Sequence, residues 1–278
     1  MQDLISENII IHKNNSALSV SPRYGGRIVS FSYKDVELIR NNSDNLLSVG
    51  STFWTSPQSV WNWPPPATID SSPYTFKRGD NSIRLTSGID KLTNFIVTKE
   101  IAPHDYGDSF VIKYKIINCN ALPVFTAPWE ITRVNKGGEF FFPSEDEKLI
   151  SKTFELSNTE KQGEIFRYKS SVGELLNKPQ LTTSQTSYGW TAYLRNDLIF
   201  IKLFERINKG EAAPGEGAVL FYASHDDDFL ELENQGKFKK ILPDEEYEYK
   251  VIWTVVETDP TASFEEIISV VKNHVSKF

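Results

Sequence analysis

The carboxylates best placed to do chemistry lie in the segment FLELEN, near the end of the chain. Its alternation predicts a β-strand with Leu230 and Leu232 on one face and Phe229, Glu231 and Glu233 on the other. Ionisable groups among aromatic side chains are typical of a functional cleft. The alternative is an outer sheet face on which the carboxylates are solvated, because exposed glutamates are the rule.

Two further strand-like segments carry charged residues at comparable positions. In IFIKLFE, Lys202 lies between Phe200 and Phe204, on the face opposite the aliphatic residues. The same alternatives apply to it, a functional cleft or a solvated outer face. In APWEITRV, Trp129, Ile131 and Arg133 alternate with Glu130, Thr132 and Val134. The proline before Trp129 predicts a strand that begins at a sheet rim, where Glu130 is either a surface carboxylate or part of a site.

The segment GSTFWTSPQSVWNWPPP contains Trp54, Trp61 and Trp63, three of the six tryptophans, and ends in three prolines. Consecutive prolines lack N–H donors and fix φ, so the segment is predicted to be a stiff, extended loop and not a central strand or helix. A rigid loop with flat aromatic faces has two interpretations. It is a lid that seals the open end of a β-sandwich core, or it is a platform that binds a ligand.

Other kinds of site are weakly supported or excluded. The motifs of P-loop, dinucleotide-binding, α/β-hydrolase and zinc-protease sites are all absent. The single cysteine, Cys119, cannot form an intrachain disulfide or a cysteine metal cluster. The run His225–Asp228, HDDD, is interpreted as a solvated turn, because one short run rarely supplies the 6–8 oxygen ligands of Ca²⁺. No cofactor or metal is expected.

The net charge of −7 and the absence of a Lys/Arg cluster argue against nucleic acid as a partner. No apolar run approaches the ~18 residues of a membrane span, so no membrane insertion is expected. The first residues lack the basic start and apolar stretch of an export signal. We therefore expect a soluble protein, cytoplasmic as the sequence stands, or periplasmic if an export signal has been removed.

Period-two patterns with turn signals about every 8–15 residues predict an all-β, antiparallel sandwich or barrel. One helix is predicted at the C-terminus, where Ser263 and Glu266 form a capping box ahead of an apolar face. That helix should pack on the outside of a sheet. The polar region 151–187 has the weakest pattern and is interpreted as an insertion loop with short strands.

Several of these segments resemble one family when they are taken in order. SVSPRYGGRIVSFSYKDVELI is similar to the opening of galactose mutarotase-like proteins, and LELENQGKFKKILPDEEYEYKVIWTV is similar to their closing unit. The middle of the chain, with FWTSPQSVWNWPPP and FTAPWEITRV, is more similar to the DUF4380 branch than to true aldose 1-epimerases. The resemblance covers roughly residues 9–257.

This resemblance implies a β-supersandwich of two large antiparallel sheets with a carbohydrate cleft on one face. In the family a glutamate acts as general base and a histidine as general acid on the sugar hemiacetal. Glu233 matches the glutamate, whereas the histidine position reads FTAPWEITRV, so that Trp129 or Glu130 stands in its place. Residues implied to line the cleft are Trp54, Gln58, Trp61, Trp63, Trp129 and Glu233, with Arg27, Glu130, Arg133, Lys202 and Glu231 as further candidates.

The sequence therefore predicts a single domain over residues 1–278 that binds a sugar or oligosaccharide in an aromatic cleft, without efficient mutarotation. One alternative is an aldose 1-epimerase-like sugar isomerase with Glu233 as base and Glu130 as acid. Another is a structural scaffold whose cleft is vestigial. The identity of the sugar and the oligomeric state stay open.

Overall fold

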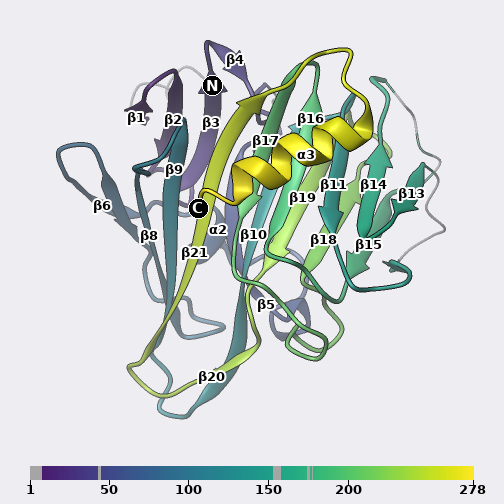
Figure 1. The fold of residues 1–278 in the computed structure, drawn as a ribbon. Helices are drawn as coiled ribbons and strands as arrows, with labels where there is room; N and C mark the ends of the chain where they lie inside the picture. Colours follow the sequence, from purple (N-terminus) through teal and green to yellow (C-terminus); the bar gives the residue numbers. More distant parts are fainter. Residues whose placement is uncertain (1–7, 43–44, 153–157, 174–175, 177) are drawn as a thin grey trace.

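Two large β-sheets stacked face to face make up most of the molecule (Figure 1). The computed structural model describes residues 8–42, 45–152, 158–173, 176 and 178–278. Strands account for 49% and helices for 8% of the structure, which confirms the predicted antiparallel all-β class. The start of the chain, on which the expectation about an export signal rests, lies outside the described residues.

The first sheet has eleven strands in the described part of the chain, and its neighbouring strands pair antiparallel. In spatial order its strands are β1 (Ile9–Lys13), β2 (Ser16–Ser21), β3 (Arg27–Tyr33), β5 (Ser51–Ser56), β10 (Val124–Asn135), β19 (Phe229–Gln235), β18 (Val219–Ala223), β15 (Gln180–Ser184) and β12 (Ile150–Ser151). Two short strands pair beside this path, β4 (Val36–Glu37) with β3 and β20 (Lys239–Ile241) with β10.

The second sheet has ten strands in the same described part, also paired antiparallel. Its order is β13 (Thr159–Gln162), β14 (Ile165–Lys169), β11 (Glu139–Pro143), β16 (Trp190–Arg195), β17 (Leu198–Leu203), β21 (Glu246–Glu257), β9 (Ser109–Asn118), β8 (Phe95–Pro103), β7 (Ile83–Thr86) and β6 (Thr75–Arg78).

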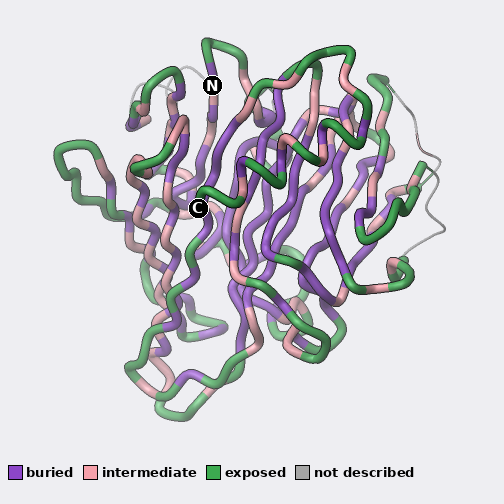
Figure 2. Tube along the Cα trace, in the orientation of Figure 1, coloured by how far each residue is buried: buried purple, intermediate pink, exposed green. Residues whose placement is uncertain are grey.

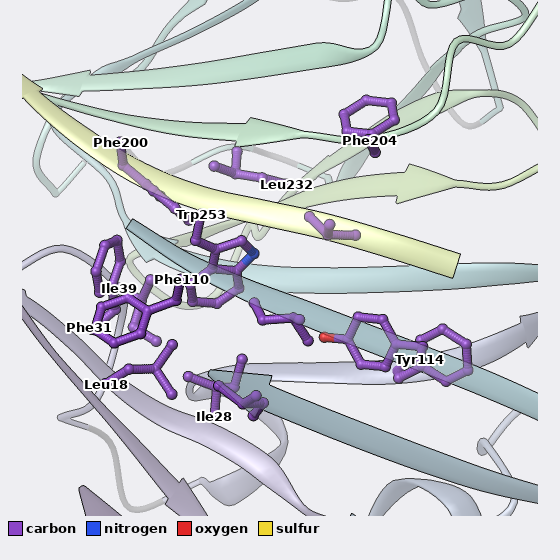
Figure 3. Packing of buried hydrophobic residues seen from close by; sticks show 14 of the residues in the cluster. Leu18, Ile28, Phe31, Ile39, Phe110, Tyr114, Phe200, Phe204, Leu232 and Trp253 are labelled. Carbon is purple, nitrogen blue, oxygen red and sulfur yellow. The ribbon is translucent and has the colours of Figure 1, made fainter. Parts of the chain in front are cut away.

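The main hydrophobic core fills the space between the sheets. Phe31 from the first sheet contacts Phe110, Phe200 and Trp253 from the second, with ring centroids 5.4–5.8 Å apart (Figure 3). Burial follows the strands, and exposed residues concentrate in the connecting loops (Figure 2). Side chains alternate between the two faces of a sheet along each strand. When a residue points into this core, the residues directly before and after it in the strand therefore point to the outer face of the sheet.

The C-terminal helix α3 (Phe264–Val275) begins at the predicted capping box, in which Ser263 and Glu266 satisfy each other's backbone N–H groups. The helix crosses the outer face of the second sheet (Figure 1). There Phe264, Ile267 and Val271 pack on an apolar patch made by Phe141, Trp190, Ala192, Ile199 and Ile201. The position predicted for this helix is confirmed.

The tryptophan-rich segment differs from the prediction in its first half. Residues Ser51–Ser56 form β5, a central strand between β3 and β10, because the prolines begin only at residue 57 and leave the earlier N–H groups free. The remainder is compact and not extended. It makes a 3₁₀ turn, Gln58–Val60, and then the single-turn helix α2 (Ala67–Asp70), which was not predicted. Another 3₁₀ turn, Leu46–Ser48, precedes β5.

The region 151–187 contains short strands, as predicted, although they extend both sheets. Strands β12 and β15 add to the edge of the first sheet, and β13 and β14 add to the edge of the second. Residues 153–157, 174–175 and 177 of this region lie outside the described residues.

Candidate functional site

A pocket of about 400 Å³ lies on the outer face of the eleven-stranded sheet, over β5, β10, β19 and β18. The alternation of β19 shows which face this is, because Leu230 and Leu232 enter the core between the sheets and Glu231 and Glu233 line the pocket. The lining residues are Asn45, Leu47, Ser48, Trp54, Gln58, Trp63, Trp129, Arg133, Lys152, Leu181, Glu216, Leu220, Tyr222, Phe229, Glu231 and Glu233.

Indole rings make the apolar side of this pocket. Trp54 meets Trp129 edge to face with ring centroids 5.4 Å apart, and Trp63 meets Trp54 at 6.0 Å. Trp61 packs behind this pair, and its Nε1 donates to the Thr55 carbonyl oxygen at 2.7 Å. Trp54 and Trp129 are buried, whereas Trp63 is 61% exposed. Trp63 therefore offers an exposed indole to the pocket, above the buried indoles of Trp54 and Trp129.

The floor tryptophan Trp54 is held by the buried carboxylate of Asp70. Asp70 Oδ1 accepts from Trp54 Nε1 at 2.8 Å and from Thr52 Oγ1 at 2.9 Å, and the Arg27 guanidinium binds both Asp70 oxygens at 3.1 and 3.2 Å. Burial raises the pKa of Asp70, but Arg27 and the hydrogen bond from Trp54 outweigh it and keep the pKa below its usual value. This ionised carboxylate fixes the indole from behind.

Glu233 lies at the base of the pocket and is 3% exposed. Its Oε2 accepts a hydrogen bond from Trp129 Nε1 at 2.8 Å, which sets its orientation. Burial raises the pKa of Glu233 to about 8, and the neighbouring carboxylates of Glu231 and Glu216 add to the effect. Burial and the nearby carboxylates therefore favour the protonated, uncharged form of Glu233.

Glu231, two residues earlier on the same strand face, has the opposite environment. Its Oε1 accepts from Arg133 Nε at 2.9 Å and pairs with Nη2 at 2.8 Å. Arg133 is almost fully buried and packs 5.8 Å from the Trp54 ring centroid. Its Nη1 is buried with no hydrogen-bond partner among the described residues, so the pocket wall retains one unused donor.

Polar contacts tie the rim of the pocket together. Glu216, in the loop before β18, pairs with Lys152 Nζ at 2.7 Å and accepts from the Gln58 backbone N–H at 3.2 Å. Three segments far apart in sequence thus meet at one side of the opening.

The structure brings most of the predicted site residues to this pocket. Seven of them line it, namely Trp54, Gln58, Trp63, Trp129, Arg133, Glu231 and Glu233. Trp61 packs behind the floor, and Arg27 supports Asp70 from below the indoles. Their roles in binding or catalysis stay predictions.

The placement expected for Glu130 and Lys202 is corrected. Both side chains lie in the core between the sheets, 0% and 1% exposed, with Lys202 Nζ 2.9 Å from Glu130 Oε2. Glu130 also accepts from the Tyr114 hydroxyl at 2.7 Å. Alternation along β10 is the reason, because Trp129 and Arg133 face the pocket and Glu130 between them must face inward.

The run His225–Asp228 forms the turn between β18 and β19. Asp227 pairs with Arg40 at 2.8 Å, and Asp226 accepts from the Ser224 hydroxyl at 2.9 Å. Across the residues the structure describes, no group of three or more His, Cys, Asp or Glu side chains is arranged to hold a metal ion.

Several residues of this site were not found by reasoning from the sequence. None of these residues belongs to a distinguishing motif: Asp70 ends the short helix α2, Lys152 and Glu216 lie in loops, and Tyr222 lies in β18. The alternation of VLFYAS identifies the face of Tyr222 once that of Leu220 is known, but the loop residues had no such signal.

No family model matches the sequence, and neither does any curated protein. Among solved structures, a galactose mutarotase-like protein from Lactobacillus casei ATCC 334 aligns with a TM-score of 0.63 at 9% identity, covering 90% of this chain and 100% of that one. A galactose mutarotase related enzyme from Lactobacillus acidophilus gives 0.60 at 9% identity, with 91% and 98% covered. A galactose mutarotase-like protein from Clostridium acetobutylicum gives 0.57 at 11% identity, with 90% and 95% covered.

Identities this low bear on the fold alone, so assignment to the DUF4380 branch stays a prediction. None of the helices in the described part of the chain is both long and apolar enough to cross a membrane. The mostly antiparallel β-sheets and the single C-terminal helix match the sandwich fold of these galactose mutarotase-like structures.

Proposed function

We propose that this protein binds a carbohydrate in the pocket over β5, β10, β19 and β18. The observation that carries the proposal is the pairing of a tryptophan wall with charged and amide side chains across one opening. Trp54, Trp63 and Trp129 supply flat apolar surface, and Gln58, Arg133 and Glu231 supply hydrogen-bonding groups.

A sugar ring suits such a pocket because it is amphipathic. Its C–H faces pack on aromatic rings while its hydroxyl groups need directed hydrogen bonds from the rim. The volume of about 400 Å³ lies within the usual range of small-molecule sites, roughly 300–1,000 Å³. The fixed indoles at the floor are already ordered, so binding loses little side-chain entropy there.

The aldose 1-epimerase alternative, with Glu233 as base and Glu130 as acid, finds no support in the geometry. Glu130 points into the core and is bound to Lys202, so it cannot reach a ligand on the other side of the sheet. Burial raises the pKa of Glu233, which favours the protonated form and opposes the ionised form that a general base needs. Binding is therefore the function that these side chains support.

Sugar binding is tested by isothermal titration calorimetry with a panel of mono- and oligosaccharides, on the wild type, Trp63→Ala and Phe76→Ala. Phe76 is a matched control, because it is an exposed aromatic residue, 48% exposed, on strand β6 of the other sheet. We expect Trp63→Ala to weaken binding about tenfold or more, as for loss of one stacked aromatic, and Phe76→Ala to have no effect. Equal affinities for both variants, or no binding by the wild type, would favour the scaffold alternative.

A further inference from the structure

We propose that the ligand of this pocket is an amino sugar, whose ammonium group binds Glu233 at the base while its ring packs on the indoles. The inference rests on the proposed carbohydrate binding and deepens it by naming the class of sugar. The observation that carries it is an imbalance of charge, because the pocket has one carboxyl group more than it has cations. A positively charged group on the ligand supplies the missing partner.

The described residues that line the pocket include three carboxyl groups and two cations. Arg133 binds Glu231 through Nε at 2.9 Å and Nη2 at 2.8 Å. Lys152 Nζ pairs with Glu216 Oε2 at 2.7 Å. Each of the two cations is therefore matched by one carboxylate, and Glu233 is the carboxyl group that is left over.

Glu233 lies in apolar surroundings. Ile131 of β10 and Leu220 of β18 are directly opposite it on the two neighbouring strands, and both are buried. The indole N–H of Trp129 donates to Oε2 at 2.8 Å, and Oε1 has no hydrogen-bond partner among the described residues. A buried carboxylate needs a counter-charge and a hydrogen-bond donor, and an ammonium group at Oε1 provides both.

The aromatic rings of the pocket also favour a cation. The negative face of an aromatic ring attracts a cation, most strongly when the ring is an indole. An amino sugar can thus place a C–H face on one indole and its charged group near another, whereas an acidic sugar brings a further negative charge toward the carboxylates. The aromatic residues that line the pocket are Trp54, Trp63, Trp129, Tyr222 and Phe229.

Binding of an ammonium group should displace a proton from Glu233. Burial and nearby carboxylates raise its pKa to about 8, so the ion pair with the ligand forms only after this carboxyl group ionises. At pH 6, where the amino group of the sugar is charged, that proton leaves to the solvent. The titratable and charged groups that face Glu233 are Glu231 on β19, Arg133 on β10, Tyr222 on β18, Glu216 before β18, Lys152 after β12 and, behind the sheet, Lys202 with Glu130.

Isothermal titration calorimetry at pH 7 tests the preference with five ligands: glucosamine, glucose, N-acetylglucosamine, glucuronic acid and cyclohexylamine. The proteins are the wild type, Glu233→Gln and the control Glu248→Gln, whose side chain is 49% exposed on β21. Circular dichroism melting checks that each variant is folded. A second set of titrations at pH 6, in two buffers of different ionisation enthalpy, counts the protons released and gives a result on the wild type alone.

We expect glucosamine to bind the wild type about tenfold or more tightly than the two neutral sugars, with glucuronic acid the weakest. The preference should vanish in Glu233→Gln and persist in Glu248→Gln. Glucosamine should release about one proton at pH 6 from the wild type and none from Glu233→Gln. Its affinity should rise about tenfold per pH unit between pH 5.5 and 7, whereas that of N-acetylglucosamine stays constant.

Equal affinities for glucosamine and glucose, tightest binding of glucuronic acid, or no proton release with glucosamine would overturn the inference and leave carbohydrate binding intact. Cyclohexylamine carries the charge without the hydroxyl groups, so we expect it to bind weakly. If it binds as tightly as glucosamine, the pocket recognises an organic cation and not an amino sugar. Absence of binding by every sugar would remove both the inference and the proposed function.

Discussion

Replacing Glu130 by glutamine should damage stability and leave sugar binding intact, since the structure places this residue in the core. Lys202 Nζ has three acceptors there, Glu130 Oε2 at 2.9 Å, Thr132 Oγ1 at 3.0 Å and the Leu232 carbonyl oxygen at 3.1 Å. The substitution Glu130→Gln keeps the shape and removes the charge that balances a fully buried ammonium group.

The size of the effect follows from breaking a buried ion pair, which costs about 3–5 kcal/mol. At about 2–4 °C per kcal/mol for a chain approaching this length, the melting temperature should fall by ~6–20 °C. Burial already lowers the pKa of Lys202, and Glu130 counteracts that effect. Without Glu130 the pKa falls further, so the loss of stability should shrink as the pH rises and the amine becomes neutral.

Urea unfolding at pH 7 and pH 9 measures this loss for Glu130→Gln, for the double variant Glu130→Gln/Lys202→Met and for the surface control Glu248→Gln. The double variant should recover much of the stability, because it leaves no unpaired charge. Calorimetry with a bound sugar should give wild-type affinity for Glu130→Gln. The reasoning is refuted if Glu130→Gln changes stability by less than about 0.5 kcal/mol, the range of ordinary surface substitutions, and abolishes binding.

Three further predictions concern other parts of the structure. Asp70→Asn should lower the free energy of unfolding by about 3–5 kcal/mol, because it removes the charge that pairs with Arg27, and should weaken sugar binding, because it loosens Trp54. Urea unfolding measures the loss of stability, and calorimetry measures the sugar affinity. The pKa of Glu233 is raised to about 8 in the folded state, so the free energy of unfolding of the wild type, relative to Glu233→Gln, should fall with rising pH between about 4.5 and 8. The fall should be about 1.4 kcal/mol per pH unit and should level off above pH 8. A stability difference between the two proteins that does not change with pH contradicts this. Ser263→Ala removes the cap of α3 and should cost about 1 kcal/mol in thermal melts, with sugar affinity unchanged.

Much of the fold could be predicted from the sequence because strand alternation and a capping box are local signals. The two faces of FLELEN were assigned correctly, with Leu230 inward and Glu233 outward. The pairing of strands distant in the chain, such as β5 with β10, leaves no comparable local pattern.

The positions of the candidate-site residues could be predicted where the alternation of side chains along a strand was applied strictly. The expected position was wrong where this alternation was ignored. Trp129 and Glu130 are adjacent in β10, so they cannot share a cavity, and placing both in one cleft disregarded that rule. Lys202 was assigned to an outer face or a cleft because lysines are rarely buried, whereas its three acceptors make burial possible. The rim contact between Lys152 and Glu216 depends on loop geometry that no sequence pattern encodes.

The most direct test of carbohydrate binding in this pocket is a titration followed through the indole N–H signals of ¹⁵N-labelled protein by NMR. Three tryptophans line the pocket: Trp63 at an exposed position, and Trp54 and Trp129 at its floor. Trp190 lies under α3, and Trp253 lies in the main core. A bound sugar should shift the signals of the three pocket tryptophans and leave those of Trp190 and Trp253 in place. Shifts confined to Trp190 and Trp253, or no shift with any sugar of the panel at high concentration, would contradict the proposed function.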